Sequence, residues 1–317
     1  MHILYIVHGF PPRENAGTEQ HCKDLALYFS GKGHRVTVIA ATREIGKHQH
    51  TVYHEVIQNI PVWRIVNNIP TRPLYQGESS PQINTLIKNI VDKIKPDIIH
   101  FHHIQFLSSS IRFSQPTIYT MHDGWLFCPS GGTQIEHPSK KTCSGASNDK
   151  CTKCYVEWKP QITNLGQRLI GISELLHPFL STQNLHRMWQ FIPPNIRQKI
   201  AREGHKKKHL KETNSAVEKR KRHMKEFAQS LDVLISPSEY LAEQAVKHNI
   251  PRPRLIRHGF PQQTLKHKGG FGFVFLGGTQ PHKGIDLLCE AFCLYLLCNS
   301  FFYYYSYLLK PALFLSK

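Results

Sequence analysis

The sequence predicts an α/β fold built on a mostly parallel sheet. Short apolar runs of strand length alternate with longer amphipathic segments of helix length along most of the chain. Strands that alternate with helices are typical of α/β domains. The first such unit reads strand, glycine-bearing loop, helix, strand, and this order requires parallel strands joined by a right-handed crossover.

Composition limits the protein class. The chain has 317 residues, enough for two domains of ~100–200 residues each. Hydrophobic residues make up 40% and charged residues 20%, which indicates a packed core and excludes global disorder. The formal net charge of +18 favours contact with polyanions such as nucleic acid, anionic lipid or phosphorylated substrates.

The first βαβ unit begins at the N-terminus. We expect a strand at Ile3–Val7, a loop at His8–Gly17, a helix at Thr18–Gly31 and a second strand at Arg35–Ala40. The loop lacks G-x-G-x-x-G spacing, so a dinucleotide fingerprint is not supported. Two alternatives stay open for its glycine. A small residue at a helix N-terminus lets backbone N–H groups approach an anion, or the glycine serves a plain tight turn.

The next segment predicts a strand pair, a helix and a strand. Residues Val52–Val66 pair around Asn59–Pro61, and Gln82–Lys95 carries apolar residues at helical spacing. A strand follows at Pro96–Phe101.

Three histidines mark the end of that strand, at positions 100, 102 and 103. Alternation along an extended chain places His100 and His102 on one face. They could bind a metal, or they could pack and form hydrogen bonds at the strand end. No carboxylate or cysteine lies beside them in sequence, which favours the second alternative.

The stretch from Pro116 to Cys154 is the centre of the functional prediction. It opens with a buried strand at Thr117–Met121 and continues as His122-Asp123-Gly124-Trp125. Ligands of open α/β sheets bind beyond the carboxyl ends of the strands, so we expect His122 and Asp123 at a binding site.

Four cysteines follow this motif, at Cys128, Cys143, Cys151 and Cys154. The N-terminus is not a signal peptide, so we expect a cytoplasmic protein, in which clustered cysteines indicate metal rather than disulfides. The close pair fits one edge of a tetrahedral site, and the loop would bring in the other two thiolates. We therefore expect a structural zinc ion in preference to an iron–sulfur cluster. The alternative is unrelated free thiols or disulfides.

The segment after the cysteines is rich in positive charge. Apolar residues between Leu175 and Leu185 suggest a helix, and residues 197–226 form a basic run. Such a run is usually a solvated helix face, and a membrane-surface or nucleic-acid patch is the alternative. Because no aromatic residue lies between the charges before Phe227, base stacking is disfavoured and nucleic acid is an unlikely partner.

The βα pattern then resumes. We expect a strand at Asp232–Ile235, a helix opened by Ser236-Pro237-Ser238-Glu239 and a short strand at Arg254–Arg257. After a polar linker, Phe271–Leu276 reads as a new strand, and Lys283–Leu288 begins a new helix. A second βα domain therefore starts near residue 270.

The C-terminal composition changes abruptly from about Cys293. Ala291–Leu309 carries no charge but contains many tyrosines, so it is a poor membrane span. We expect a premature or frameshifted end, with a tail anchor as the alternative. The expected organisation is an N-terminal domain at 1–265 with a cysteine-rich insert at 125–155, the truncated start of a second domain at 266–292, and an aberrant tail at 293–317.

Together these segments resemble glycosyltransferase family 4. The matching pieces come in the family's order, and the cysteine insert after Trp125 is similar to that of a bacterial subset. The resemblance implies a GT-B fold: a Rossmann-like parallel sheet in the N-terminal domain, with an incomplete second Rossmann-like domain. The pieces are Ala16–Glu19, Pro96–His100, Thr120–Asp123, Ser236–Glu239, His258–Gly259, Phe275–Gly277 and Lys283–Leu288.

The resemblance also implies an activity. Such enzymes transfer a sugar from a nucleoside diphosphate donor to a glycan or lipid-linked acceptor, usually with retention of anomeric configuration. It implies that His122 faces the transferred sugar and that Lys283 neutralises the departing diphosphate. Gly17 would lie near the donor phosphates and the acceptor. The other residues implied in substrate or donor binding are Thr18, Glu19, Asp123 and Gly277.

The chain also departs from the family pattern. Gly278 stands where the family usually has arginine, and the family's doubled glycine is Ala16-Gly17 here. The glutamate pair that binds the donor lies beyond the end of this sequence. We therefore expect this polypeptide alone to be inactive. The alternative function is a non-catalytic, zinc-stabilised module that binds a polyanion through residues 197–225, and the basic charge is compatible with a peripheral location at the inner membrane face.

Overall fold

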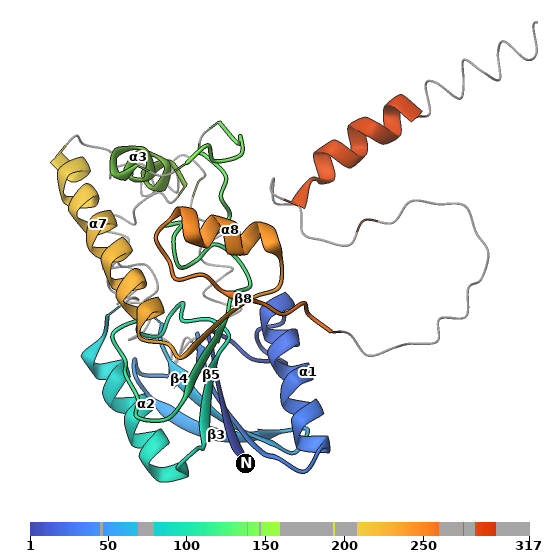
Figure 1. Ribbon diagram of the computed structural model, residues 1–317, viewed down its shortest axis with the longest axis vertical. Coiled ribbons are helices and arrows are strands. Elements are labelled where there is room, and N and C mark those ends of the chain that lie inside the picture. The colour runs from blue at the N-terminus through green and yellow to red at the C-terminus, as the bar shows by residue number, and fades with distance from the viewer. Residues whose placement is uncertain are drawn as a thin grey trace, which may run out of the picture. The chain divides into compact units, whose positions relative to one another are not determined.

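A computed structural model describes most of the chain (Figure 1). It divides into two units, Met1–Gly259 and Phe260–Lys317. In the second unit, residues 285–295 form a helix, as the sequence predicts for the segment after Lys283. The described residues are 1–44, 47–68, 79–137, 139–145, 147–158, 193, 208–259, 275 and 283–295.

The first unit contains an eight-stranded sheet in the order β3-β4-β2-β1-β5-β6-β7-β8. Every neighbouring pair is parallel except β3 and β4, so the predicted α/β class is confirmed. The strands are β1 (His2–Val7), β2 (Arg35–Thr42), β3 (Val52–Ile57), β4 (Ile60–Val66), β5 (Ile98–Phe101), β6 (Thr117–Thr120), β7 (Val233–Ser236) and β8 (Arg254–Leu255).

Helices cover both faces of this sheet (Figure 1). Crossovers from β1 to β2 and from β4 to β5 run in opposite directions, and right-handed connections then place their helices on opposite faces. Alternate residues of β1 divide accordingly: Leu4 and Ile6 join the core under α2, α7 and α8, whereas Tyr5 and Val7 join the core under α1. The described helices of this unit are α1 (Gly17–Gly31), α2 (Pro81–Ile94), α3 (Asn148–Trp158), α7 (Lys208–Gln229) and α8 (Glu239–Lys247).

Local sequence signals explain the element ends. The tight turn between β3 and β4 has positive φ at Gln58 and Asn59, 50° and 66°, which suits a two-residue hairpin. Ser80 caps α2, and Ser238 caps α8 by accepting a hydrogen bond from Leu241 N at 3.2 Å. Pro237 lies directly before that cap. The predicted helix around 175–185 lies outside the described residues, as do the tail from 296 onward and, apart from Phe275, the strand at 271–276.

Carboxylates fix the register at the strand starts. Asp97, just before β5, accepts a hydrogen bond from His2 N of β1 at 2.6 Å. Asp232, just before β7, accepts from both Thr117 N and Thr117 Oγ1 of β6, at 2.7 and 2.9 Å. Each carboxylate therefore joins the start of its own strand to the start of a parallel neighbour.

The basic run is only partly a solvated helix face. Its described part lies on α7, where Arg220 is fully buried, against the expectation for a charged run. The Arg220 guanidinium lies over the Trp125 ring at 5.0 Å and donates to the Trp125 carbonyl at 2.5 Å. This arginine therefore holds the segment after β6 against α7.

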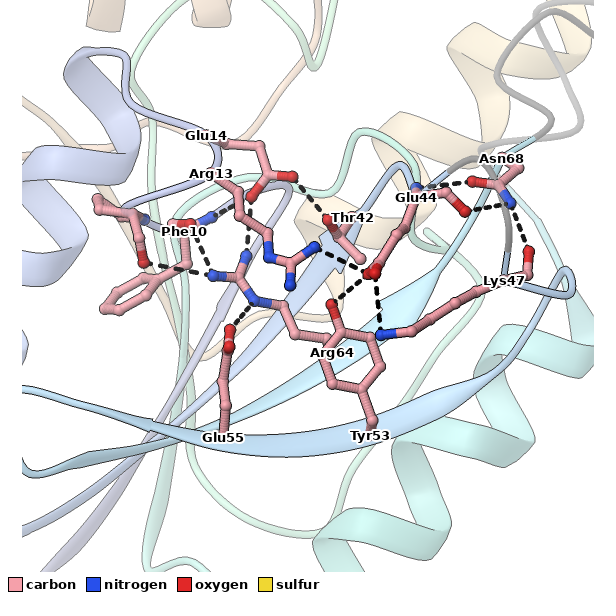
Figure 2. A network of polar contacts seen from close by, with 11 residues as sticks. Phe10, Arg13, Glu14, Thr42, Glu44, Lys47, Tyr53, Glu55, Arg64 and Asn68 are labelled. Carbon is pink, nitrogen blue, oxygen red and sulfur yellow. Dashed lines mark hydrogen bonds and ion pairs between the residues drawn. The ribbon is translucent and has the colours of Figure 1, made fainter. Parts of the chain in front are cut away.

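A second buried arginine, Arg64 on β4, organises the loop between β1 and α1 (Figure 2). Its Nε donates to Glu55 at 2.6 Å, its Nη1 donates to Glu14 at 2.8 Å, and its Nη2 donates to the Phe10 carbonyl at 2.9 Å. Glu14 also accepts from the Thr42 hydroxyl at the end of β2, at 2.7 Å. One guanidinium thus joins the β1–α1 loop to three strands.

Replacing Arg64 with methionine should lower the free energy of unfolding by about 2–4 kcal/mol, because it leaves two carboxylates and a buried carbonyl without their shared donor. Urea denaturation measures the change. The matched control is Arg13→Met, since Arg13 pairs with Glu44 at 2.9 Å but is 39% exposed. The control should lose less than about 1 kcal/mol. Equal losses of unfolding free energy in the two variants would show that the Arg64 network contributes no more to stability than an exposed ion pair does.

Candidate functional site

The crevice at the carboxyl ends of β1, β5 and β6 gathers the predicted site residues. Strand order reverses between β1 and β5, because β2 lies on one side of β1 and β5 lies on the other. Open α/β sheets bind ligands at such a switch point. His8 follows β1, His102 and His103 follow β5, and His122 follows β6.

Five imidazole rings lie together in this crevice, and we call them the histidine cluster: His21, His100, His102, His122 and His258. Ring centroids are 3.9 Å apart for His21 and His258, 5.1 Å for His122 and His258, and 5.3 Å for His21 and His122. Nδ1 of His102 lies 3.1 Å from Nε2 of His122, and His100 Nε2 lies 2.8 Å from Thr120 Oγ1. The rings of His100 and His102 lie 4.4 Å apart, which confirms that they share one face.

The cluster is electrically neutral near pH 7. Burial, followed by repulsion from neighbouring imidazoles, lowers the pKa of His21 to about 4, of His100 to about 3 and of His122 to about 2. Burial also lowers the pKa of His102 and of His258. A neutral imidazole has one nitrogen that donates a hydrogen bond and one that accepts. In the 3.1 Å contact between His102 and His122, one of the two nitrogens is therefore the donor and the other is the acceptor.

A second pair of histidines, His8 and His103, faces two carboxylates. Nε2 of His8 lies 3.1 Å from Glu19, and Nε2 of His103 lies 3.7 Å from Asp123. Partial burial by itself raises the pKa of each carboxyl, but the histidine partner and backbone N–H groups lower it below its usual value. Glu19 reaches the backbone N–H of Ala16, so it caps the first turn of α1.

Gly17, the first residue of α1, has open space where a side chain would lie. A Cβ built at this position meets no atom of the protein within 4 Å, and its φ is not in the left-handed region. The fold itself therefore does not require glycine here. His21 lies one helical turn later, so the first turn of α1 borders the histidine cluster.

Comparison with family models gives one decisive match. Residues 15–174 match the model described as Glycosyltransferase Family 4, a range that includes four of the five histidines of the cluster and the cysteine insert. The chain belongs to glycosyltransferase family 4. This membership implies a nucleotide-sugar donor and an acceptor substrate, and the parallel sheet is consistent with the N-terminal domain of a GT-B glycosyltransferase. A comparison with curated proteins found no match.

The glycosyltransferase crevice brings together some of the residues predicted from the sequence. His122 lies in the histidine cluster, and Asp123 and Glu19 lie beside it as partners of His103 and His8. Thr18 follows Gly17 in the first turn of α1. Lys283 is exposed and belongs to the second unit, and Gly277 lies outside the described residues.

The predicted zinc site at the four cysteines of the glycosyltransferase finds no support in the structure. Among the residues that the structure describes, which include all four thiols, no three histidine, cysteine or acidic side chains converge as metal ligands. Cys154 Sγ lies 3.2 Å from Ser130 Oγ, Cys143 Sγ lies 3.5 Å from the Gly145 carbonyl, and Cys151 is hydrogen-bonded to Lys221.

Burial raises the pKa of Cys128 and of Cys151, so both are thiols near pH 7 when no metal is bound. Cys151 and Cys154 lie one turn apart on α3, a helix that the sequence analysis did not predict. The spacing of the cysteines also could not reveal that these two sulfurs contact polar neighbours. The zinc prediction is therefore unsupported.

Sequence reasoning missed two members of the histidine cluster. His21 lies on α1 among polar residues, and its only signal is a spacing of four from Gly17. His258 belongs to the His258-Gly259 piece of the family resemblance, but no pattern assigned it a place beside His122. In the described part of the chain, no helix is long and apolar enough to cross a membrane.

The depressed histidine pKa values predict acid sensitivity. An unfolded histidine titrates near 6.5, so below that pH the unfolded state binds more protons, and stability falls as the pH drops toward the folded value of about 4 for His21. His21→Gln should reduce the difference in unfolding free energy between pH 7 and pH 5 by about 1–2 kcal/mol. Urea denaturation at the two pH values measures this. The control is His54→Gln, an exposed ring on β3, and a pH difference unchanged by His21→Gln would contradict the prediction.

Proposed function

We propose that this glycosyltransferase moves a sugar from a nucleoside diphosphate donor to a glycan or lipid-linked acceptor, with retention of configuration. One observation carries the proposal: the first turn of α1, with open space at Gly17, lies beside His122 through the 5.3 Å contact of His21. A helix N-terminus and a sugar-facing imidazole would then serve one substrate.

The open space at Gly17 suits a phosphate. Backbone N–H groups at a helix N-terminus and the helix dipole favour an anion, and a residue without Cβ lets that anion come close. We propose that the diphosphate, or the acceptor beside it, approaches this turn, with Thr18 at its edge. Glu19 would hold the turn in place through its bond to His8, 3.1 Å away.

His122 suits hydrogen bonding to an uncharged sugar. One nitrogen of its neutral ring is hydrogen-bonded to His102, and the other nitrogen would face the transferred sugar. Asp123 fixes the backbone beside it by accepting from Trp125 N at 2.8 Å. From the family resemblance, we also propose that Lys283 and Gly277 bind the departing diphosphate, whose developing negative charge an ammonium group stabilises.

His122→Ala should lower sugar transfer by at least about 100-fold, since it removes a group that would contact the reacting sugar. The assay incubates the full chain with a panel of nucleoside diphosphate sugars and oligosaccharide or lipid-linked acceptors, and measures the released nucleoside diphosphate. Proton NMR of the product gives its anomeric configuration. The control is His48→Ala, since His48 is exposed and does not belong to the histidine cluster. The sequence leads us to expect that this polypeptide alone is inactive, and the assay decides between that expectation and the proposal. Release of nucleoside diphosphate by the native chain would overturn the expectation, whereas no release with any donor and acceptor would overturn the proposal.

Gly17→Ala separates binding from folding. Because a Cβ at Gly17 meets no atom of the chain within 4 Å, the thermal midpoint should stay the same or rise slightly. Transfer should nevertheless fall by at least about tenfold if a phosphate occupies that space. Gly31→Ala is the matched control, since a Cβ there also meets nothing within 4 Å, at the opposite end of α1. Equal activity of the two variants would argue against a ligand at Gly17.

A further inference from the structure

A cavity of about 380 Å³ lies in the first unit between the segment after β6, helix α7 and the end of helix α8. Its size is within the range of small-molecule sites. It shares no lining residue with the histidine cluster, so it is a separate site from the crevice.

Positive side chains dominate the walls of this cavity. Helix α7 contributes Lys221, Arg222 and Lys225, and the last turn of α8 contributes Lys247. None of the lining residues is acidic. Arg222 lies 3.9 Å from Glu226, an exposed pair that offsets little of its charge. Four positive side chains and no acidic side chain therefore line the cavity.

Two of the cations in this cavity are neighbours on one helix. Lys221 and Lys225 are four residues apart on α7, so both face the same cavity wall, and a like-charge pair at this spacing destabilises a helix. Lys247 has a local reason to be basic, because cations favour the C-terminus of a helix. On α7, Lys221 is also hydrogen-bonded to Cys151. An anion bound between the two helices would offset the repulsion.

The floor of the cavity is apolar. Leu126, Phe127 and Ile250 are each less than 5% exposed, and the His248 ring stacks on Phe127 at 4.7 Å with an angle of 7° between the planes. Burial, together with the charge of Lys221, lowers the pKa of His248, which keeps this ring uncharged near pH 7. A ligand in the cavity would thus meet charge at the rim and apolar surface below.

We infer that this cavity is a binding site for a diphosphate group attached to an apolar or planar group. A diphosphate carries more than one negative charge near neutral pH, so it can pair with several of these cations at once, which a single carboxylate cannot. The apolar floor suits the attached group. Two sources share this chemistry, a nucleoside diphosphate and an isoprenoid lipid diphosphate. The inference does not depend on the proposed sugar transfer.

Calorimetric titration of the full chain tests this site with three probes: inorganic pyrophosphate, uridine diphosphate and geranyl diphosphate. The double variant Lys225→Glu with Lys247→Glu should weaken binding of all three by at least about tenfold, because it turns attraction into repulsion at the rim. The matched control is Lys32→Glu with Lys88→Glu, which makes the same charge change on exposed residues of the α1 end and α2. The control should change affinity by less than about threefold, from screened long-range charge alone.

The probes separate the two sources and test the apolar floor. Tighter binding of geranyl diphosphate than of the other probes assigns the site to a lipid diphosphate, and tighter binding of uridine diphosphate assigns it to a nucleotide. If inorganic pyrophosphate binds as well as both, the attached group has no role and the inference is overturned. It is also overturned if the two double variants lose affinity equally, or if the native chain binds no probe. Circular dichroism confirms that both variants are folded.

Discussion

The buried guanidinium of Arg64 is the constraint on which the glycosyltransferase crevice depends. It holds Glu14 and the Phe10 carbonyl of the β1–α1 loop to β4 and β3, while Glu14 also bonds to the end of β2. Because this loop leads directly into α1, the position of Gly17 follows from a charge placed two strands away. A loop with two adjacent prolines and few apolar anchors is thereby fixed without a core of its own.

The crevice combines two sources of polarity that carry no full charge, beside the carboxylates of Glu19 and Asp123. The first turn of α1 supplies aligned N–H dipoles, and the histidine cluster supplies uncharged donors and acceptors. Burial and mutual repulsion keep the imidazoles neutral, so they can face sugar hydroxyls without attracting solvent anions. The charged cavity between α7 and α8 differs in both respects, since its cations lie at the rim and its floor is apolar.

Sequence reasoning predicted the sheet well and the site only in part. Apolar runs such as Ile3–Val7 report burial directly, so strand and helix positions follow from pattern. His122 could be predicted because it comes directly after a strand, whereas His21 needed the packing of α1 against the crevice. Arg220 appeared solvated because charge runs usually are, yet Trp125 buries it. Cysteine spacing placed four thiols in one insert but contains no information on their side-chain partners.

The carboxylates at the strand starts have a further consequence. Asp97 and Asp232 align neighbouring strands at the edge of the sheet opposite the crevice. The residues at the amino ends of the strands therefore hold the strands in register, whereas the residues at the carboxyl ends present polar side chains to the crevice. Insertions and substitutions beyond the carboxyl ends, such as the cysteine insert, can accumulate without disturbing strand pairing. This separation makes the scaffold permissive to the evolution of new substrate preferences.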